Sequence, residues 1–190
     1  MSLSPSLDDL VDALRRLPGL GPRSAARIAE SLLSDNRASA LKLVRTLDRA
    51  VKTVKHCKLC NTLTDDEVCA ICADDKRDRS KICVVENPAD QRVIEETMTY
   101  RGLYFVLMGL VSPVKGIGAE ELHLSKLFER VKSDKAVREV LIATPYTPEG
   151  DATAHFIAKA MASVAPDVRV TRLARGIPAG AVSYTHLRAH

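Results

Sequence analysis

The chain has 190 residues, of which 46% are hydrophobic and 27% are charged, a balance that excludes a disordered or collagen-like chain. With three Phe, four Tyr and no Trp, it has too few aromatic rings to bind nucleic acid mainly by stacking on bases. The formal net charge of +4 lies in residues 1–56, because residues 57–190 carry equal numbers of basic and acidic residues. A local basic excess suits a polyanionic partner, and it equally suits a solvated helical surface.

The first residues and the longest apolar stretch of the chain indicate where in the cell the protein is expected. The first ten residues have neither a basic segment nor an apolar segment of the kind that opens a secretory signal. The longest charge-free apolar stretch, residues 102–114, is too short to span a bilayer. We therefore expect a cytoplasmic protein, in which structural disulfides are not expected.

Apolar residues at helical spacing predict three helices in residues 1–56. The first is expected to follow Ser6, a good N-cap residue, and to end before Pro18. The second begins at Pro22, a residue favoured in the first turn, and the third spans residues 39–55. The apolar positions are Leu7, Leu10, Val11 and Leu14, then Ile28, Ala29, Leu32 and Leu33, then Leu41, Val44, Leu47, Val51 and Val54.

The turn between the first two helices has the features of a helix-hairpin-helix motif that binds DNA. Gly19 and Gly21 allow close approach of the backbone to a ligand, and N–H groups at the start of the second helix favour a phosphate. Arg23 and Arg27 lie one turn apart, so that two guanidinium groups can hold successive phosphates. No base-reading residue is apparent, so the predicted binding is independent of DNA sequence. The alternative is a plain helical hairpin with exposed arginines.

Residues 57–80 contain four of the five cysteines and no apolar periodicity. Cys57, Cys60, Cys69 and Cys72 form a C-x2-C-x8-C-x2-C pattern, in which two knuckles complete a tetrahedral sulfur site for Zn2+. A redox pair would sit where a strand meets a helix in a βαβ unit, and neither cysteine pair does. The sequence therefore predicts one structural zinc ion per chain. Cys83 lies in an apolar run and is expected to be a small core residue.

From residue 81 to about residue 180, continuous apolar runs alternate with helical patterns. The apolar runs lie at 82–85, 104–108 and 140–143, and a fourth strand is expected at 168–173. The helices are expected to begin after Asn87, at about Ala119 and at about Asp151. This alternation predicts an α/β domain with a mostly parallel sheet covered by helices on both faces.

Three acidic residues follow strands of this predicted sheet. Glu86 ends the first strand, and Glu149 and Asp151 follow the third, at the edge where ligands collect in open α/β sheets. Together they would suit Mg2+ and phosphoryl chemistry. Alternatively, Glu149 and Asp151 are acids that face the positive end of a helix dipole. No obvious nucleophile and no Walker A motif accompany them.

The order of these parts resembles the bacterial recombination mediator family RecR. The segments that carry the resemblance are LPGLGPRSAARIA, CKLCNTLTDDEVCAIC, VVENPADQRVIEET, YRGLYFVLMGLVSPVKGIG, TPYTPEGDATA and VRVTRLARGIPAG. The resemblance implies a helix-hairpin-helix region at 1–56, a four-cysteine zinc finger at 57–80 and a Toprim domain at 81–180. It further implies a DNA-repair protein that works with RecO, and sometimes RecF, and that assembles into ring-like dimers and tetramers around DNA.

Two features depart from related proteins. Toprim enzymes carry Asp-x-Asp directly after the third strand, where this chain has Thr144 and Pro145, and RecR proteins share the altered loop. Residues 181–190 do not match the family and have the character of a foreign tail. We therefore expect a non-catalytic mediator whose Glu149 and Asp151 meet a partner protein. The rivals are a Toprim-type Mg-dependent phosphodiester enzyme and an adaptor without DNA contact.

Overall fold

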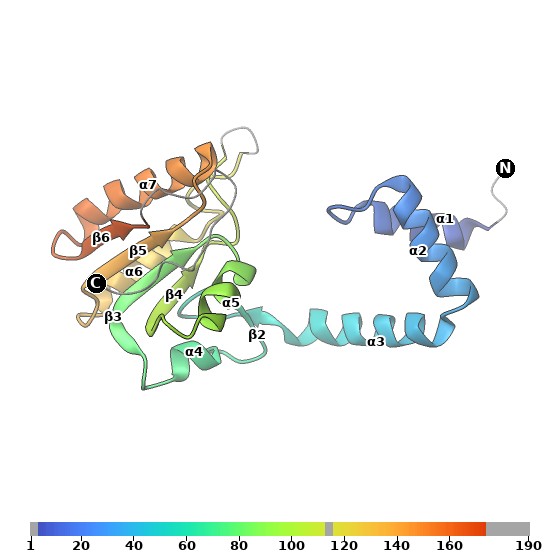
Figure 1. The fold of residues 1–190 in the computed structure, drawn as a ribbon, viewed down its shortest axis with the longest axis horizontal. Helices are drawn as coiled ribbons and strands as arrows, with labels where there is room; N and C mark the ends of the chain where they lie inside the picture. Colours follow the sequence, from blue (N-terminus) through green and yellow to red (C-terminus); the bar gives the residue numbers. More distant parts are fainter. Residues whose placement is uncertain (1–3, 113–115, 174–190) are drawn as a thin grey trace. The chain divides into compact units, whose positions relative to one another are not determined.

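The structure is a computed structural model that describes residues 4–112 and 116–173. The chain divides into two compact units, Met1–Thr53 and Val54–His190. Figure 1 shows the first unit in blue to cyan and the second from there to red. The predicted foreign tail at 181–190 lies outside the described residues. Among those residues, no helix is both long enough and apolar enough to cross a membrane.

The first unit consists of three helices, as expected: α1 (Pro5–Arg15), α2 (Pro22–Ser34) and α3 (Arg37–Thr53). Helix α1 begins earlier than predicted, with Ser4 and not Ser6 as the N-cap residue. Proline lacks an N–H group and has a preset φ, so Pro5 fits the first helical position and moves the cap back to Ser4.

Helices α1 and α2 share a small core, whereas α3 leaves its apolar face uncovered. Ala25 and Ala29 are the buried residues of α2, and the expected apolar positions of α1 are half-buried. On α3, the exposed fractions are 64% for Val44, 59% for Leu47 and 76% for Val51. The apolar spacing thus predicted the third helix correctly, but its face does not contribute to a core within this unit.

The second unit begins with a small module built around the cysteines. Strands β1 (Lys55–His56) and β2 (Leu63–Thr64) pair antiparallel, and the short helix α4 (Ala70–Ala73) follows. The compact unit starts before β1 and includes both this module and the sheet that follows it.

A four-stranded sheet forms the centre of the second unit. Its strands are β3 (Asp78–Val85), β4 (Gly102–Val106), β5 (Glu139–Ala143) and β6 (Arg169–Arg172). They lie in the order β4-β3-β5-β6, and all three pairings are parallel. The α/β fold with a parallel sheet, predicted from the continuous apolar runs, is confirmed.

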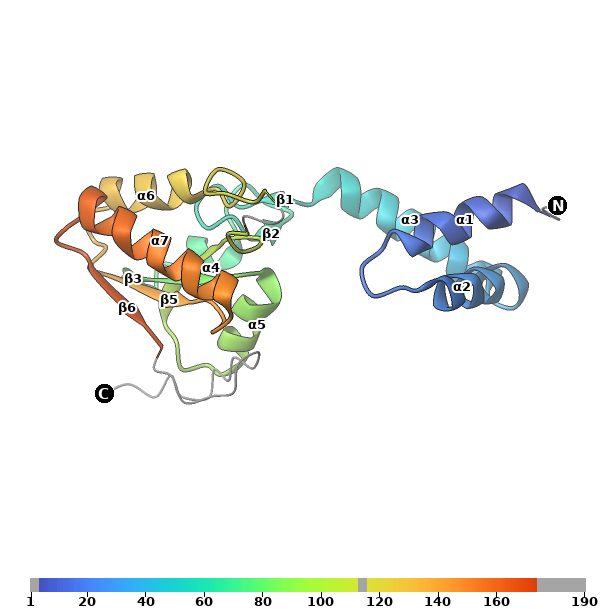
Figure 2. The ribbon, with the colours of Figure 1, turned by 90° about the horizontal axis from the view of Figure 1, so that it is seen from above.

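Helices cover both faces of this sheet. Helices α6 (Leu124–Ser133) and α7 (Pro148–Val164) pack on one face, and α5 (Pro88–Glu96) packs on the other (Figure 2). Alternate residues of β3 divide between the two cores: Ile82 and Val84 face α6 and α7, whereas Cys83 faces α5. Cys83 is fully buried, as predicted, and burial raises the pKa of its thiol.

The helix starts follow local capping chemistry. The Asn87 side chain accepts hydrogen bonds from the N–H groups of Ala89 and Asp90, and the Asp90 carboxylate accepts one from the Asn87 N–H group, so the two residues form a capping box. Helix α6 begins five residues later than predicted, because His123 adopts a left-handed backbone with φ of 51° that a helix cannot continue through. Helix α7 begins earlier than predicted, since the Thr147 hydroxyl accepts a hydrogen bond from the N–H group of Gly150.

Candidate metal centre and nucleic-acid interface

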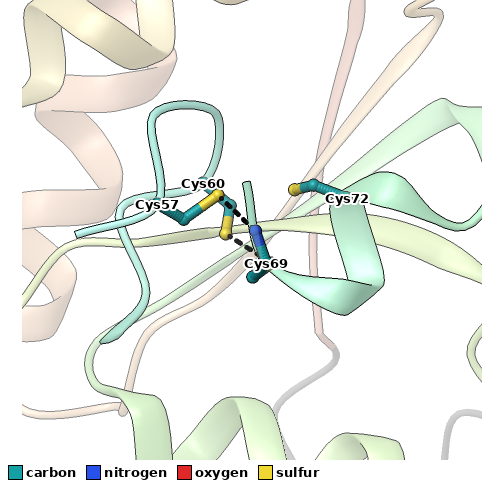
Figure 3. Close-up of side chains that lie close together, drawn as sticks. All are labelled: Cys57, Cys60, Cys69 and Cys72. Atoms are coloured by element: carbon teal, nitrogen blue, oxygen red, sulfur yellow. Dashed lines mark hydrogen bonds between the residues drawn. The ribbon is translucent and has the colours of Figure 1, made fainter. Parts of the chain in front are cut away.

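The four predicted zinc ligands converge at one point. Cys57, Cys60, Cys69 and Cys72 are all buried, and their sulfur atoms lie within 4.8 Å of one another. Figure 3 shows the two pairs approaching from the loop after β1 and from the start of α4. A tetrahedral site with Zn–S bonds near 2.3 Å needs sulfur atoms about 3.8 Å apart. The Cys60 and Cys69 sulfurs are 3.5 Å apart, so the arrangement fits zinc.

Backbone hydrogen bonds shape both knuckles. The N–H group of Asn61 donates to the Cys57 carbonyl over 3.0 Å, which turns the chain back and brings Cys60 beside Cys57. The N–H group of Cys69 donates to the Cys57 sulfur over 3.3 Å, a bond that links the second knuckle to the first (Figure 3). Cys69 is also the N-cap residue of α4, so that Cys72 follows one helical turn later and points back to the same centre.

Hydrogen bonds between the crowded sulfur atoms shift the pKa values of the cysteine thiols. The hydrogen bond with Cys69 raises the pKa of the Cys60 thiol, and burial raises it further. That same hydrogen bond lowers the pKa of the Cys69 thiol. Zinc binding requires thiolates and releases such protons, so its affinity should fall as the pH is lowered.

Hydrogen bonds of main-chain and side-chain groups bind the zinc module to the sheet and to α5. The N–H group of Val106 in β4 donates to the Cys60 carbonyl over 2.8 Å, and the Asn61 side chain donates to the Val106 carbonyl over 2.8 Å. The Thr62 hydroxyl donates to the side chain of Gln91 in α5 over 2.6 Å. All three contacts involve buried groups, so the module and the sheet share one hydrogen-bonded structure.

The predicted DNA-binding residues lie at the turn between α1 and α2. Gly19 has a φ of +82°, in the left-handed region that favours glycine, and Gly21 is the N-cap residue of α2. Because Gly21 has no side chain, the N-cap residue forms no side-chain hydrogen bond with the first N–H groups of α2. Arg23 and Arg27 are exposed, and neither forms an ion pair within the described parts of the chain. These features suit a phosphate, which needs free N–H groups and cations.

The three predicted acids do not assemble into one cluster. Within residues 4–112 and 116–173, the four cysteines are the only such group of potential metal ligands. Burial, with a smaller effect of the Asp90 charge, raises the pKa of Glu86. Glu149 is exposed in the first turn of α7, whereas Asp151 is half-buried and forms a 2.7 Å ion pair with Arg172. The structure therefore gives Asp151 a partner within the chain.

Arg172 is a site residue that the sequence did not suggest. Besides Asp151, its guanidinium donates to the Pro145 carbonyl over 3.3 Å and stacks 4.2 Å above the Tyr146 ring. It thereby links β6 to the loop after β5. Because 21 residues separate Arg172 from Asp151, no local sequence pattern indicates that the two side chains meet.

Three family models match consecutive parts of the chain. Residues 7–51 match the RecR helix-hairpin-helix, residues 54–74 match the RecR four-cysteine zinc finger domain, and residues 80–174 match the Toprim domain. The chain belongs to the RecR family. The expected resemblance is thereby confirmed, together with one structural zinc held by the four cysteines. The RecR architecture is that of a recombination mediator in DNA repair.

Proposed function

We propose that this RecR chain is a non-catalytic mediator that binds DNA through backbone phosphates, irrespective of sequence, and recruits RecO, and in some settings RecF. The hairpin of α1 and α2 holds the DNA, and the carboxyl edge of the Toprim sheet meets the partner protein. The observation that carries the proposal is the uncapped N-terminus of α2 beside two exposed arginines one turn apart. We propose that the protein acts in the cytoplasm.

Arg23 and Arg27 provide the test of DNA binding. Each lost phosphate contact lowers the log–log salt slope by about 0.9 for duplex DNA, so the double alanine variant should lose about two units of slope. The weakening should be equal for unrelated sequences. The matched control is the double alanine variant of Arg45 and Arg49, which are also exposed and four residues apart, on α3. If both double variants lost the same salt slope and DNA affinity, net charge alone would explain the effect. That result would contradict the assignment of DNA binding to the hairpin.

The partner site is proposed at Glu149, with Asp151 beside it. Glu149 is exposed in the first turn of α7, directly after Pro148, and an exposed acid at a rim chiefly accelerates association with a basic partner. Glu149→Lys should therefore weaken RecO binding while zinc content and DNA affinity stay at wild-type levels. The control is Glu129→Lys, at an exposed acid on α6. Unchanged RecO affinity in Glu149→Lys would remove this residue from the partner site.

A Toprim-type magnesium enzyme is the competing function. The position of Glu86 at the carboxyl end of β3 favours it, as does the raised pKa that burial gives this carboxyl. The Arg172–Asp151 ion pair opposes it, because the guanidinium already supplies a cation to that carboxylate. Incubation of purified protein with Mg2+ and supercoiled plasmid decides between them: nicking that Glu86→Gln abolishes would establish the enzyme and overturn the mediator.

Self-association of this RecR chain is proposed to involve α3. Val44, Leu47 and Val51 are exposed and spaced by three and then four residues, the spacing of a coiled-coil seam. A second copy of the same helix presents the same spacing and can therefore cover this face. This surface, the α3 seam, supports the dimers and larger rings that the resemblance to RecR implies.

A further inference from the structure

Arg130 of helix α6 contacts the zinc module through its guanidinium group. Nη1 of Arg130 donates to the Leu59 carbonyl over 2.8 Å and to the Tyr104 carbonyl over 3.0 Å. Leu59 lies between the zinc ligands Cys57 and Cys60, whereas Tyr104 lies in β4. A single guanidinium group thus joins the first zinc knuckle to the sheet, across 71 residues of sequence.

Among the residues that the structure describes, no carboxylate serves as a counter-ion for Arg130. Arg130 is half-buried and forms no ion pair in the part of the chain that the structure describes. Four thiolates around Zn2+ leave a formal charge of about −2 in a buried site. A neighbouring cation stabilises that charge, and a low effective dielectric strengthens the effect.

We propose that Arg130 is a positioning residue of the zinc centre: it holds the Leu59 carbonyl of the first knuckle and offsets the negative charge of the zinc–thiolate cluster. The Toprim domain thereby sets how firmly the zinc finger retains its metal. Groups outside the ligand shell commonly change metal affinity by about 10–100-fold. The inference rests on the zinc site alone and is independent of the proposed DNA and partner surfaces.

A simpler role for Arg130 is structural. Arg130 and Lys132 lie in the last turn of α6, where any cation favours the helix dipole. That role affects folding stability and leaves zinc retention by the folded protein unchanged. The two roles therefore differ in the rate of zinc release measured under native conditions.

The experiment measures zinc transfer from the purified full chain to the chromogenic chelator 4-(2-pyridylazo)resorcinol, with melting temperatures recorded in parallel. Arg130→Met removes both the charge and the hydrogen bonds, and zinc release should accelerate at least about tenfold. Arg130→Lys keeps the charge but replaces the planar guanidinium with an ammonium of different reach and donor geometry, so its release rate should be intermediate. Absorption of the cobalt-substituted protein should shift in both variants, because the geometry of the first knuckle changes.

Two controls separate the proposal from loss of charge and loss of stability. Lys132→Met removes a neighbouring exposed cation, and Val131→Ala removes core packing from the same helix. Both should release zinc at the wild-type rate. Wild-type release in Arg130→Met, or equal acceleration in Val131→Ala, would overturn the proposal. If Arg130→Met does not fold, Arg130→Lys decides, since wild-type release and an unshifted cobalt spectrum there would overturn the role of the hydrogen bonds.

Discussion

Gly19 and Gly21 have different backbone conformations in the hairpin turn. Gly19 adopts a φ of +82°, which a residue with a Cβ reaches only with strain. Gly21 has a φ of −80°, which every residue adopts readily. A Cβ at either position would meet no other atom within 4 Å. Gly19 is therefore required for the turn itself, whereas the absence of a side chain at Gly21 matters mainly for a ligand that approaches from outside.

This difference separates folding from DNA binding. Gly19→Ala should lower the free energy of unfolding by about 1–2 kcal/mol, the usual cost of a left-handed residue with a Cβ. Gly21→Ala should cost less than about 1 kcal/mol as a weaker N-cap, yet it should weaken DNA binding because the Cβ intrudes on the phosphate. Thermal unfolding and a DNA titration on each variant measure both effects. Wild-type DNA affinity in Gly21→Ala would contradict a phosphate at the start of α2.

Residues that act through local spacing were predicted from the sequence, and residues that act across the fold were not. The zinc ligands follow from two C-x2-C pairs, because each knuckle is a local structure. Arg130 and Arg172 reach carbonyl and carboxylate groups through hydrogen bonds that join distant segments. Neither arginine differs from an ordinary surface cation in the sequence. Only the packing of α6 and the pairing of β6 with β5 bring them to their partners.

At the scale of the elements, the zinc module is continuous with the sheet. Its contacts with Val106 and Gln91 are buried hydrogen bonds, and the cysteine cluster has few apolar neighbours to replace the metal: Leu59, Val68 and Ile71. Structural zinc contributes roughly 10–16 kcal/mol of apparent binding energy in isolated fingers. Zinc removal should therefore unfold the module and free the edge of β4.

Substitution of one ligand tests this coupling. Cys69→Ser should abolish stoichiometric zinc binding and accelerate amide hydrogen exchange at Asn61 and Val106, while β5 in the sheet interior keeps its protection. Metal analysis and residue-resolved hydrogen exchange measure the two results. Cys83→Ser is the matched control, since Cys83 is buried in the core and should leave one zinc bound. Full zinc content in Cys69→Ser would contradict the four-sulfur site.

The existence of the elements was predicted more reliably than their ends. Continuous apolar runs identified β3, β4 and β5, because strand segments buried on both faces have no polar alternation to obscure them. The sequence of β6, RVTR, is not a continuous apolar run, and this strand is only partly buried. The start of α6 was wrong by five residues, since nothing in the sequence indicates that His123 adopts a left-handed backbone. The apolar face of α3 indicated a helix correctly, but periodicity alone does not reveal which surface covers that face.

At the scale of the whole molecule, the two compact units divide the proposed work. The first unit carries the hairpin and the α3 seam, and the second carries the zinc module and the Toprim sheet. The α3 seam is a long exposed apolar face, and such a face on a soluble protein commonly marks an interaction surface. A surface for self-association beside a DNA-binding hairpin would place several hairpins on one DNA molecule, and linked sites bind more tightly than single ones.

Charge substitution on the α3 seam tests self-association. Val44→Glu combined with Leu47→Glu brings like charges together across the interface between two copies, and Glu favours helix, so each chain should still fold. Light scattering should show the wild-type mass falling with dilution and the double variant at the monomer mass throughout. The control combines Lys42→Gln with Arg49→Gln, which changes the net charge equally on the opposite face of α3 and should assemble as wild type does. A monomeric wild type, or a double variant of wild-type mass, would contradict the α3 seam as the surface where copies of this RecR chain meet.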